Sequence, residues 1–332
     1  MEQPSQVKSD EIVALQQWVA GHLLGGESPE QVISALVERG IAINEAEQQV
    51  VSANEHPYLT VARDVAGRLQ RIEYMLDFFR QLDTLTPSRL AVPRRSGLSA
   101  EEFLDSYYAA NRPVIVTDLV PRWRAHGRWS PLYLRDRYGE STVEVEIGRA
   151  GDPQFIRRKE EFKRSVRLAD YVDLVLAGGE TNDHYLVGNS YNLDRDGLRG
   201  LLDDIDYFPD YLADPDRARR LLFWFGPAGT VTPLHHDHVN SILAQLYGRK
   251  RVRLYPPTQT PLMYNSFKGF SDVDCEVPDF NKFPRFRDAT PMDVILNPGE
   301  ALFIPIDWWH HVRSLEVSMN VSLLNFTWMN WS

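Results

Sequence analysis

The sequence predicts an α+β protein in which helices dominate the N-terminal quarter and short strands dominate the remainder. Apolar residues recur with helical spacing from about residue 9 to residue 86. A segment rich in Pro, Arg and Ser then breaks this periodicity, and β-rich runs separated by turns follow it. We therefore expect a helical domain over 1–86, a linker over 87–97 and a strand-rich domain over 98–332.

The composition excludes several classes of protein. The 332 residues are 43% hydrophobic, which is enough apolar material for cores in about two domains. The net charge of -10 argues against nucleic acid as a partner, because basic side chains supply the affinity for phosphates. The single cysteine, Cys275, suits a reducing compartment, and no run approaches the roughly 18 apolar residues of a membrane span. We expect a soluble, cytoplasmic protein that binds neither nucleic acid nor membranes.

Capping residues divide the N-terminal domain into helices. A polar side chain at the first position accepts hydrogen bonds from free backbone N–H groups, and glycine or proline often marks a boundary. The expected N-terminal caps are Ser9 or Asp10 for the first helix, Ser28 before Pro29 for the second, and Asn44 with Glu47 for the third.

The fourth helix, expected over about 58–83, carries apolar residues at alternating steps of four and three. This is heptad spacing, in which one stripe can bury against another helix. The stripe consists of Val65, Leu69, Ile72, Leu76 and Phe79. Packing on the other helices or on the second domain is one outcome, and a homodimer through this helix is the alternative.

The second domain opens with a short helix at Ser99 and Glu102, and short strands follow it. Strands with few intervening helices favour an antiparallel barrel or a two-sheet roll over a doubly wound parallel sheet. The expected strands cover 114–117, 142–147, 185–187, 221–225, 242–246, 251–255 and 301–304.

Five of the nine histidines lie in two short runs, TPLHHDH and DWWHHV. In an extended strand residues i and i+2 share a face, so His235 and Asp237 project together. His310 lies at the end of another apparent strand, and it completes a set of two imidazoles and one carboxylate. Such a set is typical of non-haem Fe(II) oxygenases. We interpret the remaining three histidines of these runs as surface groups or as groups around the site: His236, His238 and His311.

Lys250 begins a strand, KRVRLYPP, that follows a turn and can fold back beside the strand of His235. A buried lysine needs a counter-anion. A dicarboxylate that chelates the metal at one end would supply this anion at its other end. Thr232, three residues before His235, can face the same site only if the segment around Pro233 twists or bulges.

Residues 97–328 resemble the JmjC-type, cupin-like Fe(II)/2-oxoglutarate oxygenases through the runs WFGPAGTVTPLHHDHVNSILAQLYGRKRVRLYPP and NPGEALFIPIDWWHHVRSLEVSMNVSLLNF. Within that family the chain is most similar to the arginyl-hydroxylase-like branch. The resemblance implies a double-stranded β-helix, the cupin-like jelly roll. It also implies Fe(II) bound by His235, Asp237 and His310, with 2-oxoglutarate and O2 as co-substrates.

The resemblance implies further contacts around the metal. Lys250 and Thr232 would bind the distal carboxylate of 2-oxoglutarate, and Tyr185 would reach the same group. Trp224 would lie near the substrate. No side chain beyond the metal centre is expected to act as a catalyst. The iron-chelating end of 2-oxoglutarate has three candidate contacts, which are Asn240, Ser241 and Asn325.

The implied reaction is hydroxylation of a protein or peptide side chain, arginyl in the branch named above, with release of succinate and CO2. The acidic balance of the chain would suit a basic peptide. Hydroxylation of a small molecule and N-methyl demethylation are alternatives. Two alternatives of another class are a metal-dependent cupin that does not use 2-oxoglutarate and a non-catalytic binding module.

Overall fold

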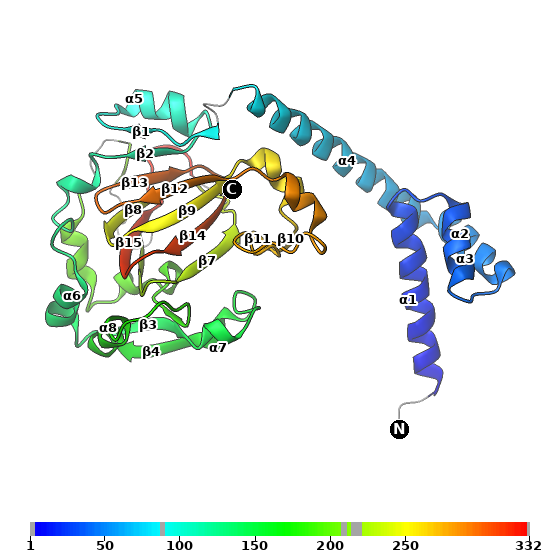
Figure 1. Cartoon of the computed structure of the whole chain (residues 1–332), viewed down its shortest axis with the longest axis horizontal. Helices are drawn as coiled ribbons and strands as arrows, with labels where there is room; N and C mark the ends of the chain where they lie inside the picture. Colours follow the sequence, from blue (N-terminus) through cyan, green and yellow to red (C-terminus); the bar gives the residue numbers. More distant parts are fainter. Residues whose placement is uncertain (1–3, 87–89, 207–210, 214–220, 331–332) are drawn as a thin grey trace. The chain divides into compact units, whose positions relative to one another are not determined.

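A computed structural model describes residues 4–86, 90–206, 211–213 and 221–330, with side chains from Glu11 onward. The chain forms two compact units, Met1–Phe78 and Phe79–Ser332 (Figure 1). The division falls inside the last N-terminal helix and therefore before the expected linker over 87–97. Residues 87–89 of that linker lie outside the described residues.

The helical unit packs around a small apolar core. Its helices are α1 (Pro4–Leu24), α2 (Pro29–Glu38), α3 (Ile43–Glu55) and the first part of α4 (Pro57–Thr84). The buried residues come from all four helices and recur at helical spacing, as expected for amphipathic segments. They are Val19, Leu23, Val32, Leu36, Ala46, Val50 and Leu59.

The expected caps of two helices are confirmed. The Oγ atom of Ser28 accepts the backbone N–H of Gln31, and the Gln31 side chain accepts the backbone N–H of Ser28. Ser99 accepts the backbone N–H of Glu102 at the start of α5 (Ala100–Phe103). Reciprocal hydrogen bonds of this kind satisfy donors that a helix leaves free at its first turn.

Two other helix starts differ from the expectation. Helix α1 begins at Pro4, before Ser9 and Asp10, whose side chains lie outside the described part of the chain. The prediction for α3 is wrong, because Ala42 adopts the extended cap conformation (φ -61°, ψ 140°) and Asn44 lies inside the helix. No side-chain hydrogen bond caps α3. The helix therefore begins where the backbone of Ala42 is extended, without a polar capping residue.

Within its described residues, the second unit contains two six-stranded sheets and a smaller one. In order of pairing, the first sheet holds β1 (Arg94–Arg95), β2 (Val114–Val116), β13 (Ala301–Ile304), β8 (Ser241–Tyr247), β15 (Ser318–Leu323) and β6 (Leu221–Gly226). The second holds β10 (Asn265–Phe267), β11 (Phe270–Ser271), β7 (Val231–His235), β14 (Trp309–Ser314), β9 (Lys250–Tyr255) and β12 (Met292–Leu296). The third holds β4 (Lys163–Arg167), β3 (Thr142–Ile147) and β5 (His184–Tyr185).

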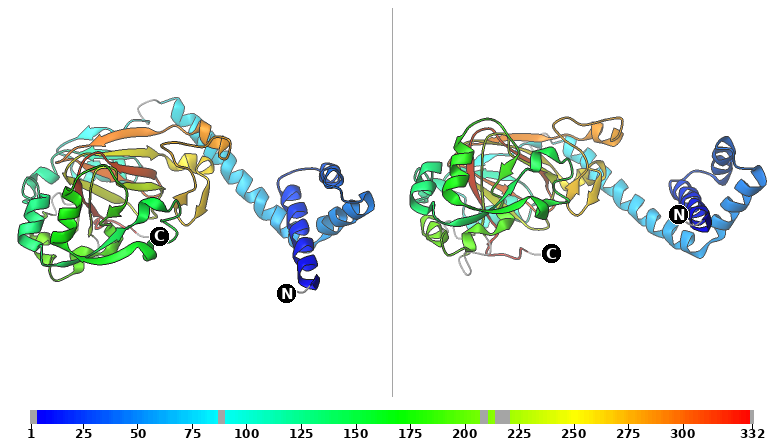
Figure 2. Two further views of the ribbon diagram at one scale, coloured as in Figure 1. Left: turned by 60° about the horizontal axis from the view of Figure 1, so that its bottom comes forward. Right: turned by 90° about the horizontal axis from the view of Figure 1, so that it is seen from below.

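Short helices and turns complete this unit. Helices α6 (Pro131–Tyr138) and α8 (Leu168–Leu176) contact each other at one side of the sheets (Figure 2), and α7 (Lys159–Phe162) contacts β3. A π-helical turn follows α5 at Leu104–Tyr108. The part of the chain that the structure describes also contains the 3₁₀ turns Val120–Arg122, Arg149–Gly151, Gly188–Ser190, Asn192–Asp194, Arg199–Asp204, Pro257–Leu262 and Pro284–Asp288.

The chain alternates between the two large sheets, which makes the core a jelly roll. From β6 to β9 successive strands enter the first and second sheets in turn, and from β12 to β15 they do so again. The pairings among these eight strands are antiparallel, and β12, β9, β14 and β7 lie next to one another (Figure 1). The expected two-sheet roll and the cupin-like fold are thereby confirmed.

One part of the expected linker belongs to a sheet. Arg94 and Arg95 pair in parallel with Ile115 and Val116 of β2, and the Arg94 guanidinium donates to Glu300. Backbone pairing at the sheet edge therefore orders a segment whose composition indicated a loop. Among the described residues, none of the helices combines the length and the apolarity needed to cross a bilayer.

Candidate functional site

A cavity of about 60 Å³ lies between the two large sheets and adjoins a wider one of about 580 Å³. The two cavities share lining residues, including Trp224, Thr232 and His235. The inner cavity receives side chains from both sheets. Its polar lining residues are Tyr185, Trp224, Thr232, His235, Asp237, Ser241, Lys250, His310, Asn320 and Ser322.

The structure brings His235, Asp237 and His310 together. His235 ends β7 and pairs directly with His310 of β14, so their rings lie side by side with centroids 4.1 Å apart. The Nε2 atoms of His235 and His310 lie 3.9 and 3.8 Å from Oδ2 of Asp237. Ligand atoms of the three side chains all lie within 4.8 Å of one another. Antiparallel pairing thus explains how residues far apart in the sequence converge.

Both imidazoles are oriented for metal binding. Nδ1 of His235 contacts the Pro233 carbonyl at 2.8 Å, and Nδ1 of His310 contacts the Trp308 carbonyl at 2.9 Å. If each Nδ1–H donates to its carbonyl, the lone pair of each Nε2 faces the cavity, which is the usual arrangement around a ligating histidine. The donor set therefore fits a divalent metal that accepts nitrogen and oxygen ligands.

The electrostatics of the three groups favour the ligating forms. Burial, followed by the neighbouring His235, lowers the pKa of His310 to about 4, so this imidazole is neutral at neutral pH. Burial opposes ionisation of Asp237, but the nearby His235 and His310 hold the pKa of its carboxyl below the usual range. A neutral imidazole and an ionised carboxylate are the forms that bind metals.

The sequence suggested that His310 lies at the end of the preceding strand, but the structure places it in a new strand. That strand, β13, stops at Ile304, and His310 is the second residue of β14. Asp307 lies between them with φ 62°, a left-handed conformation that breaks a strand. Because of this turn, β14 runs beside β7 in the second sheet.

A β-bulge turns Thr232 toward the cavity. The pairing of β7 with β14 shifts register between His310 and Val312, which pair with His235 and Thr232. Pro233 and Leu234 of β7 therefore both oppose His311 of β14, and the usual alternation of faces is broken. Thr232 and His235 consequently both line the inner cavity, as the sequence analysis required of this segment.

Lys250 reaches the cavity from a strand that does not lie directly beside β7, as the sequence had suggested it would. Its strand β9 pairs with β14 and β12, so β14 separates it from β7. The side chain is 1% exposed, and Nζ donates to the hydroxyl of Tyr185 at 3.0 Å and to Oδ1 of Asn320 at 2.5 Å. Both acceptors are neutral, and burial lowers the pKa of the Lys250 amine to about 7. The site therefore presents a desolvated amine that an anion would stabilise.

Arg149 holds Tyr185 in place, and sequence reasoning missed it. Its buried guanidinium donates to Glu146 at 2.6 Å and to the Val231 carbonyl at 2.6 Å, and it lies over the Tyr185 ring at 5.1 Å from the centroid. These contacts connect β3 and β5 to β7 next to Thr232. Burial raises the pKa of Tyr185, while Arg149 opposes the rise, so the phenol keeps its proton.

Strand β15 supplies two further polar residues that sequence reasoning missed. Asn320 accepts the hydrogen bond from Lys250, and the Oγ atom of Ser322 accepts the indole N–H of Trp224 at 3.1 Å. The pattern Ser318, Asn320, Ser322 in a strand of otherwise apolar residues was the available signal, because alternate residues of a strand share a face.

The three candidates for the iron-chelating end occupy different places. Ser241 lines the inner cavity. Asn240 accepts the backbone N–H of Ile306 and contacts Asn330, so its side chain fixes loops. Asn325 donates to the Ala213 carbonyl, and the lining of the inner cavity does not include it.

The lining of the wider cavity carries charges of both signs. Arg157, Lys159 and Lys268 line it together with Glu160. Arg157 pairs with Asp272 and lies over the Phe267 ring at 4.8 Å from the centroid. The acidic balance of the whole chain therefore does not extend to this opening.

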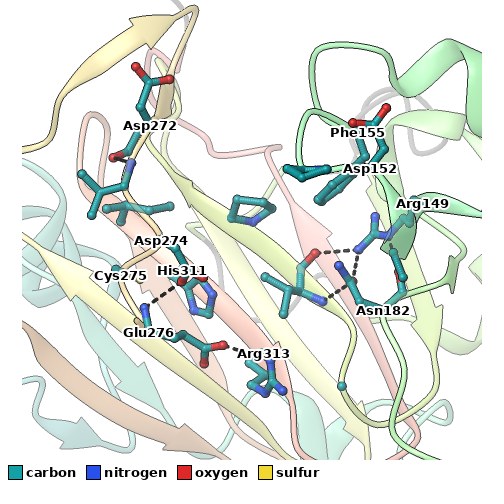
Figure 3. Close-up of a pocket in the computed structure, with 18 of the residues that line it drawn as sticks. Arg149, Asp152, Phe155, Asn182, Asp272, Asp274, Cys275, Glu276, His311 and Arg313 are labelled. Carbon is teal, nitrogen blue, oxygen red and sulfur yellow. Dashed lines mark hydrogen bonds and ion pairs between the residues drawn. The ribbon is translucent and has the colours of Figure 1, made fainter. Parts of the chain in front are cut away.

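His311 faces away from the inner cavity that His310 lines. Adjacent residues of a strand point to opposite faces, and His311 lines a separate cavity of about 700 Å³ together with Arg313 and Asp274 (Figure 3). Burial, followed by the charge of Arg251, lowers the pKa of His311 to about 4. His311 is thus a buried neutral group on the far side of β14.

Comparison with known proteins gives the same family that the residues indicate. A family model described as a cupin-like domain matches residues 99–330. The chain is 34% identical over 243 residues to lysine-specific demethylase 8 of Xenopus tropicalis. It is 38% identical over 260 residues to lysine-specific demethylase JMJ30 of Arabidopsis thaliana. The chain belongs to the cupin-like JmjC family.

The two demethylases extend well beyond the part that aligns with this chain. The alignments cover 71% and 72% of this chain but 53% and 55% of the two demethylases, so the chain spans about half their length. The tRNA wybutosine-synthesizing protein 5 of Gallus gallus is 29% identical over 248 residues, covering 69% of this chain and 76% of that protein. None of these three names refers to an arginyl hydroxylase, so they do not support the branch that the sequence suggested.

Proposed function

We propose that this JmjC protein is an Fe(II)- and 2-oxoglutarate-dependent oxygenase. One observation carries the proposal: His235, Asp237 and His310 converge in the cavity that the buried amine of Lys250 also lines. A site that bound metal alone would not need an uncompensated buried amine, which costs free energy. A diacid that binds both groups explains why the chain retains it.

The residues of the chain have distinct parts in this reaction. His235, Asp237 and His310 would hold Fe(II) on one face, and the metal with 2-oxoglutarate supplies the oxidising chemistry. Lys250 and Thr232 would bind the distal carboxylate, with Tyr185 and Asn320 orienting the amine. The apolar walls, which include Leu243, Ile304 and Val312, keep water from the inner cavity.

The substrate that we propose is a protein or peptide side chain, which is hydroxylated with release of succinate and CO2. The volume of the outer cavity, about 580 Å³, and the names of the demethylase relatives support this class. N-Methyl demethylation is the second candidate, because the same relatives are called lysine-specific demethylases. Both reactions begin with removal of a hydrogen atom and differ in the carbon that the site presents to the metal.

A peptide screen read by mass spectrometry separates these reactions. Arginine- and methyl-lysine-bearing peptides are incubated with the protein, Fe(II), 2-oxoglutarate and O2. A gain of one oxygen atom coupled to succinate supports hydroxylation, and loss of a methyl group supports demethylation. A substrate turned over without succinate would contradict the proposal and favour a cupin that does not use 2-oxoglutarate. The variant Asp237→Ala controls for oxidation by free iron.

We further propose that α4 joins two copies of the chain. Val65, Leu69 and Ile72 lie on its heptad stripe and are 50%, 56% and 53% exposed. A stripe of this spacing is self-complementary, because a second α4 can bury it by the packing of a coiled coil. A cytoplasmic location and the lack of a nucleic-acid partner stay predictions.

A further inference from the structure

A second group of metal-ligating side chains lies beside the triad. His236 and His238 alternate with His235 and Asp237 along the chain, just after β7 ends at His235. Their partner is Asp307 of the turn before β14. Ligand atoms of His236, His238 and Asp307 all lie within 4.8 Å of one another.

The contacts of this group converge on one point. Nδ1 of His236 and Nδ1 of His238 each lie 3.0 Å from the same atom, Oδ1 of Asp307. The two rings are nearly perpendicular at 86°. Two donors that needed only a hydrogen bond could use both carboxylate oxygens, but here both nitrogens approach one oxygen. The result is a triangle of nitrogen, nitrogen and oxygen atoms.

Backbone hydrogen bonds hold His236 and Asp307 in place, while the His238 side chain is 63% exposed. The N–H of His236 donates to the Gly269 carbonyl, and the N–H of Asp307 donates to the Asp237 carbonyl, both at 2.9 Å. The His236 ring packs on Trp309 with centroids 4.5 Å apart. Asp307 keeps a left-handed φ of 62°, which places its carboxylate between the two imidazoles. Ligands that are fixed before binding lose little entropy when an ion arrives.

We propose that His236, His238 and Asp307 bind a second divalent metal ion, for which zinc is the best chemical match. Zinc takes imidazole nitrogen and carboxylate oxygen at about 2.0–2.2 Å in tetrahedral geometry, which separates ligand atoms by about 3.3 Å. The two nitrogen–oxygen distances therefore need to lengthen by only about 0.3 Å. Calcium and magnesium prefer oxygen ligands, so two imidazoles disfavour them. His236 and His238 also line the outer cavity, so the fourth ligand position is open to water there.

Zinc binding is measured by equilibrium dialysis of the untagged full chain followed by elemental analysis. The background variant carries His235→Ala and His310→Ala, which removes the first site without touching the second. This variant is expected to bind one equivalent of Zn²⁺, and adding Asp307→Asn is expected to abolish the binding. Asparagine tolerates the left-handed φ and keeps an acceptor for imidazole N–H groups, so a purely hydrogen-bonded cluster survives this change.

Two further variants test whether the bound zinc lies at His236, His238 and Asp307. His238→Gln in the same background is expected to lose the ion as well, while Asp272→Asn, an acid outside the cluster, retains it. Should the background variant fail to fold, the same comparison in the wild-type chain predicts two equivalents of Zn²⁺ and one in Asp307→Asn. Absence of zinc from the folded background variant, or retention after Asp307→Asn, would overturn the proposal. The zinc stoichiometry of the second site is measured with the first site removed or counted separately. The zinc result therefore does not depend on whether the protein is an oxygenase.

Discussion

The amine of Lys250 on β9 donates a hydrogen bond of 2.5 Å to Oδ1 of Asn320 on β15, and this contact spans the space between the two large sheets. A buried ammonium supported only by neutral acceptors is costly in a folded protein. The buried amine therefore lowers the stability of the ligand-free fold at the position where a diacid would bind.

Replacing Lys250 separates its role in binding from its role in folding. Lys250→Met keeps an apolar stem of similar length and removes the buried amine, so we expect the melting temperature of the ligand-free protein to stay equal or rise. Affinity for 2-oxoglutarate is expected to fall at least tenfold, about 1.4 kcal/mol or more. Differential scanning calorimetry and titration calorimetry with Mn²⁺ as the metal measure the two effects. Lys282→Met, on an exposed lysine, is the matched control. A lower melting temperature with unchanged affinity would mean that the amine is structural.

The pKa of Lys250 predicts how co-substrate affinity depends on pH. Because burial lowers this pKa to about 7 in the free protein, the amine is mostly neutral above that pH. Binding of a dianion favours the charged form, so each binding event takes up a proton and affinity falls by about tenfold per pH unit above about pH 7. Titrations in buffers of different ionisation enthalpy measure the uptake. Lys250→Met should show no such slope, and a pH-independent affinity in the wild-type protein would be inconsistent with this assignment.

The same pKa shift affects stability. The unfolded lysine has a pKa of about 10.4, so between about pH 7 and pH 10.4 the unfolded chain binds more protons than the folded one. The contribution of Lys250 to the free energy of unfolding therefore rises with pH across this window. The difference in stability between Lys250→Met and wild type should shrink from about pH 7 toward pH 10, as measured by denaturant titration. A constant difference would argue against a shifted pKa.

Asn325 is expected to affect stability and not co-substrate binding. Asn325 is 3% exposed and its side-chain amide donates to the Ala213 carbonyl, so Asn325→Ala removes a hydrogen bond from a partly buried acceptor. We expect a loss of about 0.5–1.5 kcal/mol in the free energy of unfolding and an unchanged affinity for 2-oxoglutarate. Ser241→Ala, in the cavity lining, is the comparison. If Asn325→Ala weakened co-substrate binding, the role suggested by the family resemblance would stand.

The oligomer proposed for α4 is tested by introducing a charge into its apolar stripe. Ile72→Glu places a carboxylate where two helices would meet, so the mass in sedimentation equilibrium should fall from two chains to one. Gln70→Glu, off the stripe of Val65, Leu69 and Ile72, adds the same charge and should leave the dimer intact. A wild-type protein that sediments as a single chain at the highest concentration would exclude this interface.

Local periodicity predicted much of the fold and part of the site. The i, i+2 spacing of His235 and Asp237 placed both on one face, and the heptad stripe located α4 almost to the residue. The cap at Asn44 was predicted wrongly because polar residues within a helix have the same local pattern as caps. The position of His310 depended on a left-handed turn at Asp307, which the residue type alone does not reveal.

Contacts across the jelly roll could not be predicted from sequence spacing. Asn320 meets Lys250 because β15 and β9 belong to opposite sheets, and no local pattern encodes how two sheets face each other. Arg149 likewise reaches Tyr185 and Val231 from a 3₁₀ turn distant in sequence. The alternation of polar residues in β15 is visible in the sequence. It identifies a polar face of the strand, but not that Lys250 contacts this face.

Anaerobic spectroscopy of the chelate is the most direct test of the central claim that one cavity binds Fe(II) and 2-oxoglutarate together. Adding both to the wild-type protein should produce a weak visible charge-transfer band, which neither component gives alone. The band should be lost in His310→Ala and should require higher 2-oxoglutarate concentrations in Lys250→Met. A wild-type protein that shows no band at saturating metal and co-substrate, or a band that persists unchanged in His310→Ala, would contradict the account.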